Sequence, residues 1–359
     1  MASPDADNFK LTVLSPGGRD LAQYFDELAE PDSPAHPPVN FHGFAASTNG
    51  AFHRDVKVAL AEKAPVLILL RGNFKASQHA LMECKKIKRT VAISFKETGL
   101  HQIAQQLSDR KKLSRFLEIA AKADGCIATT QEATGIFRQA RGKLDPITVA
   151  FIPTPYPLEE AKWNMSIQPN QQSGILIGTR EWDVPSRNHA TAVLMARRLC
   201  EETNEPVTVF NFDGRKGAKL LSEMKFSDGK LRVIDKRKPY AEYLREVTKH
   251  KIVLQLDRSR VPGQVAGDAL LARTICVGGD GAIERIAFPN FCGEGRSVEQ
   301  LHSIALELLK NTTVRATAII ESQWRGMEQL SFRSGRKQLE NFFTQLANPS
   351  FPSINPPTF

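Results

Sequence analysis

The sequence has no long apolar run and no paired cysteine motif. None of its 359 residues belongs to a stretch approaching the roughly 20 apolar residues that a membrane-spanning helix needs. Met1–Lys10 contains no apolar core of a signal peptide. The five cysteines are an odd number without a CxxC pair, which argues against a disulfide framework and a structural zinc site. We therefore expect a cytoplasmic protein with free, buried thiols.

Internal repeats are absent as well, and the composition shows no bias towards disorder. Hydrophobic residues make up 41% and charged residues 24% of the chain, as in ordinary globular proteins. A chain of 359 residues has about the length of two domains, each able to bury its own core. The net charge of +9 favours an anionic partner, which leaves nucleic acid, an anionic membrane surface and a phosphorylated ligand open.

Short apolar runs alternate with helical stretches, the pattern of parallel sheets built from βαβ units. Val66–Leu70, for example, is a continuous apolar run and predicts a strand buried on both faces. Further strands are predicted over 9–14, 39–44, 90–94, 125–129, 147–152, 174–178, 207–211, 231–234, 252–256 and 274–277. Helices are predicted over 21–28, 54–62, 78–84, 100–121, 131–139, 190–202, 218–224, 240–249, 267–272, 297–310, 315–329 and 334–347.

A change of composition divides the chain. Residues 158–173 are polar and contain Gln, Asn and Pro, which predicts a connection between domains. We expect Rossmann-like domains over 1–157 and 174–333, and a C-terminal helix with a Pro-rich tail over 334–359 that returns to the first domain. The predicted fold is α/β, with two doubly wound domains facing each other across a cleft. Ligands of such sheets bind at the carboxyl ends of the strands.

Three stretches resemble the glycosyltransferases of the GT-B fold, group 1 (family 4-like). Ala123–Thr130 and the strand ending in Ile152-Pro153 resemble the end of that family's N-terminal domain. Gly174–Arg180 is similar to the first strand of its donor domain. Residues 240–288 resemble the segment that carries its EGFGLvxLEAM motif, and Val261–Leu270 is the part that resembles the motif itself. The likeness spans roughly residues 10–345 and is one of order and spacing more than of identity.

The resemblance implies a nucleoside-diphosphate sugar, linked to UDP or GDP, as the donor. Its diphosphate needs cations and backbone N–H groups. Arg180 and Arg187 flank a strand-to-helix turn and would supply bidentate charged contacts. The amides around Gly263 and Gln264 lie at the next predicted helix N-terminus, where the helix dipole favours negative charge.

Other donor contacts are implied by position within the motif. Asp268 falls on the family's second acidic position, which holds the ribose, and Ile234 lies in the segment that cups the base. At the first acidic position, which helps to hold the donor sugar, this chain has Arg260. Two readings of Arg260 stay open: an ion pair with Asp257, or a contact with an anionic sugar or diphosphate.

The acceptor of such enzymes usually binds the N-terminal domain. Arg71–Lys75 and Ser94–Thr98 are polar clusters at the ends of predicted strands, so both should line the cleft. Glu97 is the candidate for acid–base work or for a contact with the acceptor hydroxyl, and a plain surface loop is the alternative. His101 is the nearest match to a histidine that the family often carries. The histidine spacing suggests no metal site.

The function implied is transfer of a hexose-like sugar to a hydroxyl of a glycan, lipid-linked or small-molecule acceptor, in cell-surface or secondary glycan synthesis. The resemblance implies retention of configuration, and no metal or other cofactor is expected because arginines would neutralise the leaving diphosphate. Two alternatives stay open: a catalytically degenerate GT-B scaffold, suggested by Arg260, and a glycosyltransferase that modifies nucleic acid. The sequence does not support the latter, because it contains no basic stripe interleaved with aromatic residues of the kind that stacks on bases. The same charge would also hold the protein at the anionic inner face of a membrane.

Overall fold

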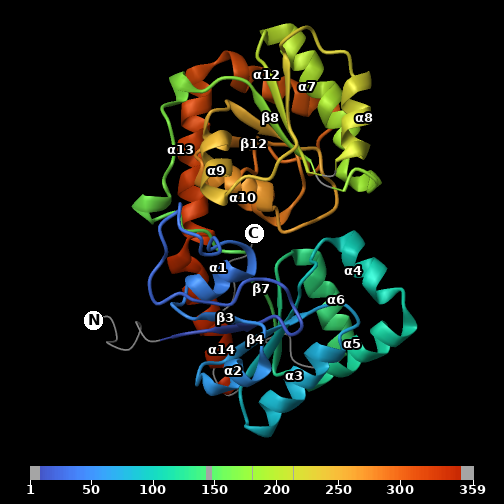
Figure 1. Ribbon diagram of the computed structural model, residues 1–359, viewed down its shortest axis with the longest axis vertical. Helices are drawn as coiled ribbons and strands as arrows, with labels where there is room; N and C mark the ends of the chain where they lie inside the picture. The colour runs from blue at the N-terminus through green and yellow to red at the C-terminus, as the bar shows by residue number, and fades with distance from the viewer. Residues whose placement is uncertain (1–8, 143–147, 180, 213, 349–359) are drawn as a thin grey trace. The chain divides into compact units, whose positions relative to one another are not determined.

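The computed structural model describes residues 9–142, 148–179, 181–212 and 214–348 (Figure 1). Within these ranges the chain forms two compact units. Unit 1 contains residues 9–29, 35–155 and 332–348, and unit 2 contains residues 30–34 and 156–331. Both units are α/β and are built on parallel sheets, which confirms the predicted fold class.

Unit 1 contains a seven-stranded sheet in the order β2-β3-β1-β4-β5-β6-β7. Neighbouring strands are parallel, except that the edge strand β2 runs antiparallel to β3. The strands are β1 (Thr12–Leu14), β2 (Gln23–Tyr24), β3 (Ala51–His53), β4 (Val66–Leu70), β5 (Val91–Phe95), β6 (Gly125–Ala128) and β7 (Val149–Phe151). The helices are α1 (Asn40–Ala46), α2 (Val56–Ala61), α3 (Lys75–Lys86), α4 (Leu100–Leu107), α5 (Arg110–Lys122), α6 (Gln131–Arg141) and α14 (Phe332–Ala347).

The two faces of this sheet follow from the alternation of side chains along its strands. Ile68 of β4 belongs to a core that also contains Phe116 of α5, together with residues of α2, α3, α4 and α6. Its neighbour Leu67 points the other way, into a core with α1 and α14 that includes Phe342. Helix α14, drawn in red, comes from the end of the chain and covers one face of the blue strands (Figure 1).

Two predicted elements of unit 1 are wrong. The predicted helix over 21–28 is an extended segment whose residues Gln23–Tyr24 pair with β3 as an edge strand. The predicted strand over 39–44 is the helix α1. All of its residues after the first are buried, so they show no amphipathic period that would distinguish a helix from a buried strand.

Unit 2 contains a five-stranded parallel sheet in the order β10-β9-β8-β11-β12. The order reverses between β8 and β11, so this is the crossover point at which doubly wound sheets bind ligands. The strands are β8 (Ile175–Thr179), β9 (Val207–Asn211), β10 (Leu231–Ile234), β11 (Ile252–Leu254) and β12 (Ile275–Val277). The helices are α7 (His189–Thr203), α8 (Arg215–Glu223), α9 (Tyr240–Thr248), α10 (Gln264–Leu271), α11 (Ala282–Ala287), α12 (Val298–Lys310) and α13 (Thr312–Gln329). None of the described helices combines the length and the apolar composition that crossing a bilayer requires.

Candidate functional site

The loops after β8 and β11 meet at the crossover point of unit 2 and are tied to each other. The Arg258 N–H donates to the Ser186 carbonyl oxygen at 2.7 Å. The hydroxyl oxygens of Ser186 and Ser259 are 2.7 Å apart. Asn188 Nδ2 donates to the Leu256 carbonyl oxygen at 3.0 Å. The crossover edge is therefore held by hydrogen bonds that join the two loops.

Arg187 lies in this edge, and its charge is already compensated. Its guanidinium forms ion pairs with Glu181 and Asp257, and its side chain is only 14% exposed. Burial alone would lower the Arg187 pKa, but the charge of Asp257 and the contacts of Glu181 outweigh it and raise the pKa. Arg187, which the sequence predicts to bind the diphosphate, is thus already paired with two carboxylates of the protein. The other, Arg180, lies outside the described residues.

Arg260 has a left-handed backbone, with φ of 48°. Its N–H donates to Asp280 Oδ1 at 3.1 Å, and its guanidinium is 3.6 Å from Asp280 Oδ2 and 3.8 Å from Glu294 Oε1. The side chain remains 39% exposed. Burial raises the Asp280 pKa even though the Arg260 N–H and charge lower it. The Arg260 side chain is therefore more accessible than that of Arg187, which is 14% exposed.

The first turn of α10 lies beside the end of β8. A Cβ on Gly178 would be 3.4 Å from the Val265 side chain, so these elements are in van der Waals contact. Gly263 precedes the helix with φ of 92°, a backbone conformation that glycine adopts without strain. The first N–H groups of a helix have no partner within it, and here they belong to the turn that starts at Gln264. The structure brings the predicted anion-binding residues Gly263 and Gln264 to the crossover edge.

Glu284 of α11 is a buried acid that the sequence analysis did not assign to the site. Its side chain is 0% exposed, and neither carboxyl oxygen accepts a hydrogen bond from another described residue. Three glycines enclose it: a Cβ would lie 2.1 Å from Oε2 at Gly263, 2.3 Å from Oε2 at Gly281 and 2.9 Å from Oε1 at Gly279. Burial raises the Glu284 pKa to about 8. At neutral pH this group is mainly an uncharged acid.

Asp268 lies among three of the four tyrosines of the chain. Tyr240 donates its hydroxyl to Asp268 Oδ1 at 2.6 Å. Burial raises the Asp268 pKa to about 7, although hydrogen bonds from Tyr240, Tyr243 and Tyr156 lower it. Only 2% of Asp268 is exposed. A ribose hydroxyl would have to displace a tyrosine to reach this carboxyl group, so the structure does not present Asp268 as an open ribose ligand.

The remaining donor candidate of unit 2, Ile234, ends the edge strand β10 and is half-buried. The next residue, Asp235, accepts a hydrogen bond from Asn211 Nδ2 at 2.9 Å. Asn211 also accepts one from Trp182 Nε1 at 3.1 Å. Trp182 and Asn211 follow or end the strands β8 and β9, so a polar cluster with an indole lies beside Ile234 at the carboxyl ends of these strands.

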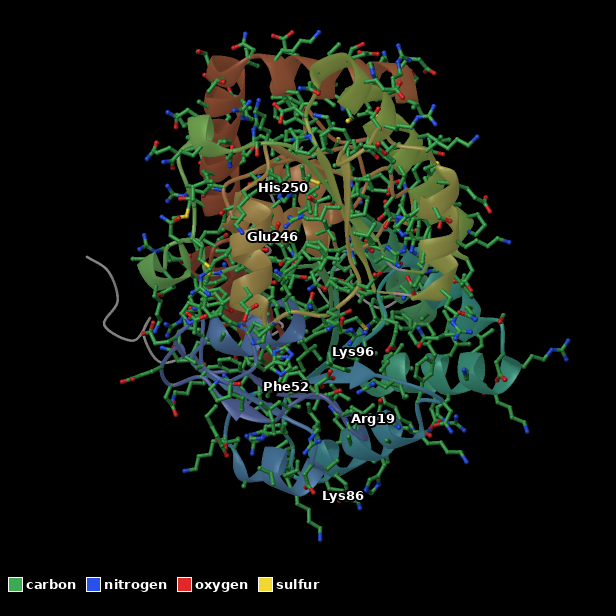
Figure 2. The ribbon with its side chains drawn as sticks, turned by 45° about the horizontal axis from the view of Figure 1, so that its top comes forward. Arg19, Phe52, Lys86, Lys96, Glu246 and His250 are labelled. Carbon is green, nitrogen blue, oxygen red and sulfur yellow. The ribbon has the colours of Figure 1, made fainter. Side chains whose placement is uncertain are left out.

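A second group of polar residues lies at the carboxyl edge of the unit 1 sheet. Asp20 is 3.1 Å from Lys96 Nζ and 3.4 Å from Arg71 Nη1, which is also 3.4 Å from the Ser15 hydroxyl. Burial alone would raise the Asp20 pKa, but Lys96 and Arg71 outweigh it and lower the pKa. Lys96 Nζ also lies 5.9 Å from the ring centre of Phe52 (Figure 2).

A pocket of about 510 Å³ opens beside this cluster. Six residues line it: Arg71 and Gly72 follow β4, Glu97 follows β5, Gln105 and Gln106 lie in the last turn of α4, and Lys112 lies on α5. The two polar segments singled out in the sequence therefore share one pocket through Arg71 and Glu97. His101, in the first turn of α4, is not among its lining residues. The helix residues were missed because helical side chains carry no sequence signal of which strand end they approach.

Metal-binding side chains do not gather at either edge. Within the described ranges, no three His, Cys, Asp or Glu side chains form a group that could hold a metal ion.

Comparison with solved structures identifies the fold. No family model and no curated protein matches the sequence. HepE of Anabaena, solved in complex with UDP, is 12% identical, with a TM-score of 0.63, 94% of this chain covered and 100% of that chain. Trehalose 6-phosphate synthase of Burkholderia multivorans is 9% identical, with a TM-score of 0.66 and coverages of 96% and 100%. These proteins are GT-B glycosyltransferases, and this chain has their fold.

A longer protein is also similar. S. aureus TarM, solved with fondaparinux, α-GlcNAc-glycerol and UDP, is 13% identical with a TM-score of 0.58. The match covers 84% of this chain, which spans 58% of TarM. The likeness at this level of identity concerns the fold.

Proposed function

We propose that this protein is a glycosyltransferase that moves a sugar from a nucleoside-diphosphate donor to a hydroxyl group of an acceptor. The observation that carries the proposal is the GT-B fold over nearly the whole chain, shared with HepE, which was solved with UDP. The crossover edge of unit 2 supports it because an exposed cation and a helix N-terminus lie there together. Such groups stabilise the charge of a leaving diphosphate.

For the donor we propose a site at the loops after β8 and β11. The backbone N–H groups at Gly263 and Gln264 would donate hydrogen bonds to the diphosphate, and Arg260 would add an accessible positive charge. Ile234 would contact the base at the end of β10. Arg187 would act by positioning the edge through Glu181 and Asp257, since both carboxylates already hold it.

For the acceptor we propose the pocket of unit 1 that contains Glu97. Its carboxylate has no hydrogen bond or ion pair with any described residue, so it can accept the proton of an acceptor hydroxyl. The bond from the anomeric carbon to the diphosphate oxygen breaks, and the bond from that carbon to the acceptor oxygen forms. The proposal includes retention of the anomeric configuration, which the stereochemistry of the product tests. It also includes independence of metal ions, which activity in the presence of a chelator tests.

The first test is nucleotide binding by calorimetry, with UDP and GDP in turn, followed by product formation with a panel of UDP- and GDP-linked sugars. Arg260→Ala should weaken nucleotide binding about tenfold, the typical effect of one charge-assisted contact. Arg273→Ala is the matched control: Arg273 has φ of 52°, close to the 48° of Arg260, and lies exposed at the other end of α10. Absence of both nucleotide binding and transfer with every donor would overturn the proposal.

One alternative is favoured by specific observations. The neutralised Arg187 and the enclosed Asp268 remove two expected donor contacts, as a GT-B scaffold without catalysis would. A scaffold would show no sugar transfer, and Arg260→Ala and Glu97→Gln would both leave its cellular phenotype intact. An enzyme would lose that phenotype with Glu97→Gln.

A further inference from the structure

The pocket of unit 1 is lined only by polar side chains and glycine. None of the residues that line it is apolar, and two of them, Arg71 and Lys112, are cationic, whereas Glu97 is the one anion. Small-molecule pockets in proteins are usually lined mainly by apolar and aromatic groups. This lining therefore fits a hydroxyl-rich ligand and does not fit a lipid chain.

One atom in the pocket lacks a hydrogen-bond donor. Gln106 Nε2 donates to the Gln102 carbonyl oxygen at 3.2 Å, which orients the carboxamide. The other end of that carboxamide, Oε1, is buried and accepts no hydrogen bond from any described residue. A buried polar atom without a partner is destabilising, and native proteins seldom leave one. Because this oxygen is shielded from solvent, a ligand hydroxyl would supply the missing donor once the Gln106 side chain turns towards the pocket.

The two cations of the pocket, Arg71 and Lys112, differ in whether an acidic side chain already pairs with them. Arg71 shares Asp20 with Lys96 and contacts Ser15. Lys112 forms no ion pair with any described residue, and its backbone N–H caps α5 through Asp109 without using its ammonium group. The pocket thus has on one wall an ammonium group without an ion pair to a described residue, although the backbone N–H of Lys112 and then the charge of that group help to lower the pKa of Asp109.

We propose that this pocket binds a sugar that carries an anionic group, a phosphate or a carboxylate. Lys112 and Arg71 hold the anion, while Glu97 and Gln106 accept hydrogen bonds from ring hydroxyls. The assignment rests on the glycosyltransferase function proposed above and names the chemical class of the acceptor. A negatively charged acceptor also agrees with the net charge of +9 on the chain.

The test measures binding to the whole protein without nucleotide, by ligand-observed NMR at millimolar concentration. The probes are glucose 6-phosphate, glucuronate, glucose and inorganic phosphate. We expect at least one charged sugar to bind about tenfold more tightly than glucose, as one charge-assisted hydrogen bond provides. The same sugar should bind more tightly than inorganic phosphate, because the ring hydroxyls add contacts. Binding of glucose 6-phosphate alone assigns the phosphate, and binding of glucuronate alone assigns the carboxylate.

Variants on α5 separate the pocket from general surface charge. Lys112→Gln should weaken the charged sugar about tenfold and leave glucose unchanged. Lys111→Gln removes the same charge from the adjacent exposed residue, which does not line the pocket, and should have no effect. Gln106→Leu should weaken charged and neutral sugars alike. Both lysines lie at or near the helix surface, so the variants should melt at the temperature of the parent.

Three outcomes would overturn the acceptor assignment: no sugar probe binds, glucose or inorganic phosphate binds as tightly as the charged sugar, or Lys111→Gln acts like Lys112→Gln. Titration with UDP and GDP is run in parallel. Nucleotide binding without sugar binding refutes the acceptor assignment alone. Charged-sugar binding without nucleotide binding and without transfer from any donor refutes the glycosyltransferase proposal and leaves the assignment of the pocket intact.

Discussion

At the carboxyl edge of the unit 1 sheet, Asp20 lies between two cations, whereas in unit 2 the acids Asp268 and Glu284 are buried without an ion pair to any described residue. The effect on the acids is opposite. Cations lower the Asp20 pKa, while burial raises the pKa of Asp268 to about 7 and that of Glu284 to about 8. The acid at the edge of unit 1 therefore keeps its negative charge at neutral pH, whereas the pKa values of the two buried acids of unit 2 lie near neutral pH.

This difference shows why acidic residues in a motif do not by themselves mark ligand contacts. A carboxylate that binds ribose hydroxyls has to be accessible. Asp268 is instead enclosed by tyrosines, and Glu284 by glycine backbone. Both acids are therefore buried behind the crossover edge, whereas the Arg260 side chain at that edge is 39% exposed.

The largest expected effect concerns the packing of Tyr156 on α10. A Cβ on Gly267 would lie 2.2 Å from Tyr156 Cζ, and Tyr156 is fully buried. Gly267→Ala should therefore lower the free energy of unfolding by about 3 kcal/mol, as overpacking of a filled core does. Denaturant unfolding followed by tryptophan fluorescence measures this, because all three tryptophans, Trp163, Trp182 and Trp324, lie in unit 2.

Gly135→Ala is the matched control for this change. Gly135 also lies inside a helix, α6, but nothing lies within 4 Å of the Cβ that it would gain. Alanine there should stabilise unit 1 by about 0.5 to 1 kcal/mol, because alanine favours helix more than glycine does, and hydrogen exchange of unit 1 amides measures it since the tryptophans lie in unit 2. Equal effects of the two substitutions would show that Tyr156 does not fill the space at Gly267.

The contact between Tyr156 and Gly267 also shows where sequence reasoning ends. Local apolar patterns predicted Val66–Leu70 and Leu231–Ile234 with the bounds that the structure has. The rule that strand ends share an edge brought Arg71 and Glu97 together. Contacts between side chains far apart in the chain leave no such local pattern. The tyrosines around Asp268, the glycines around Glu284 and the helix residues of the unit 1 pocket are of this kind.

The next effect in size is the contribution of Glu284 to the pH dependence of unit 2 between pH 5 and pH 6.5. Glu284 keeps its proton in the folded protein up to about pH 8, whereas an ordinary glutamate loses it near 4.5. Between these values the folded state binds more protons, so stability is highest below the lower pKa and falls as the pH rises towards the upper one. The loss per group is about 1.4 kcal/mol per pH unit, or about 2 kcal/mol between pH 5 and pH 6.5. Asp268 also lowers the stability of the folded state as the pH rises, in its case between pH 3.8 and about pH 7.

Glu284→Gln removes one of these two contributions. The amide has the shape of the protonated acid and does not titrate, so the variant should gain stability relative to the parent as the pH rises above 4.5. Denaturant unfolding of both proteins at pH 5, 6 and 7 measures the difference. A stability difference that is the same at all three pH values would contradict the raised pKa of Glu284.

The smallest expected effect is at Asp20, and its sign is opposite. Because its pKa is lowered in the folded state, the stability that it contributes is present above the ordinary value of 3.8 and is lost as the pH falls through the lower, folded value. Asp20→Asn should cost about 1 kcal/mol at pH 7 and progressively less as the pH falls below 3.8. Hydrogen exchange of unit 1 amides measures this. Asp26→Asn, which removes an exposed ion pair with Lys10 in the same unit, should change stability by less than about 0.5 kcal/mol. If both substitutions behave alike, Asp20 is an ordinary surface acid and the contrast with unit 2 disappears.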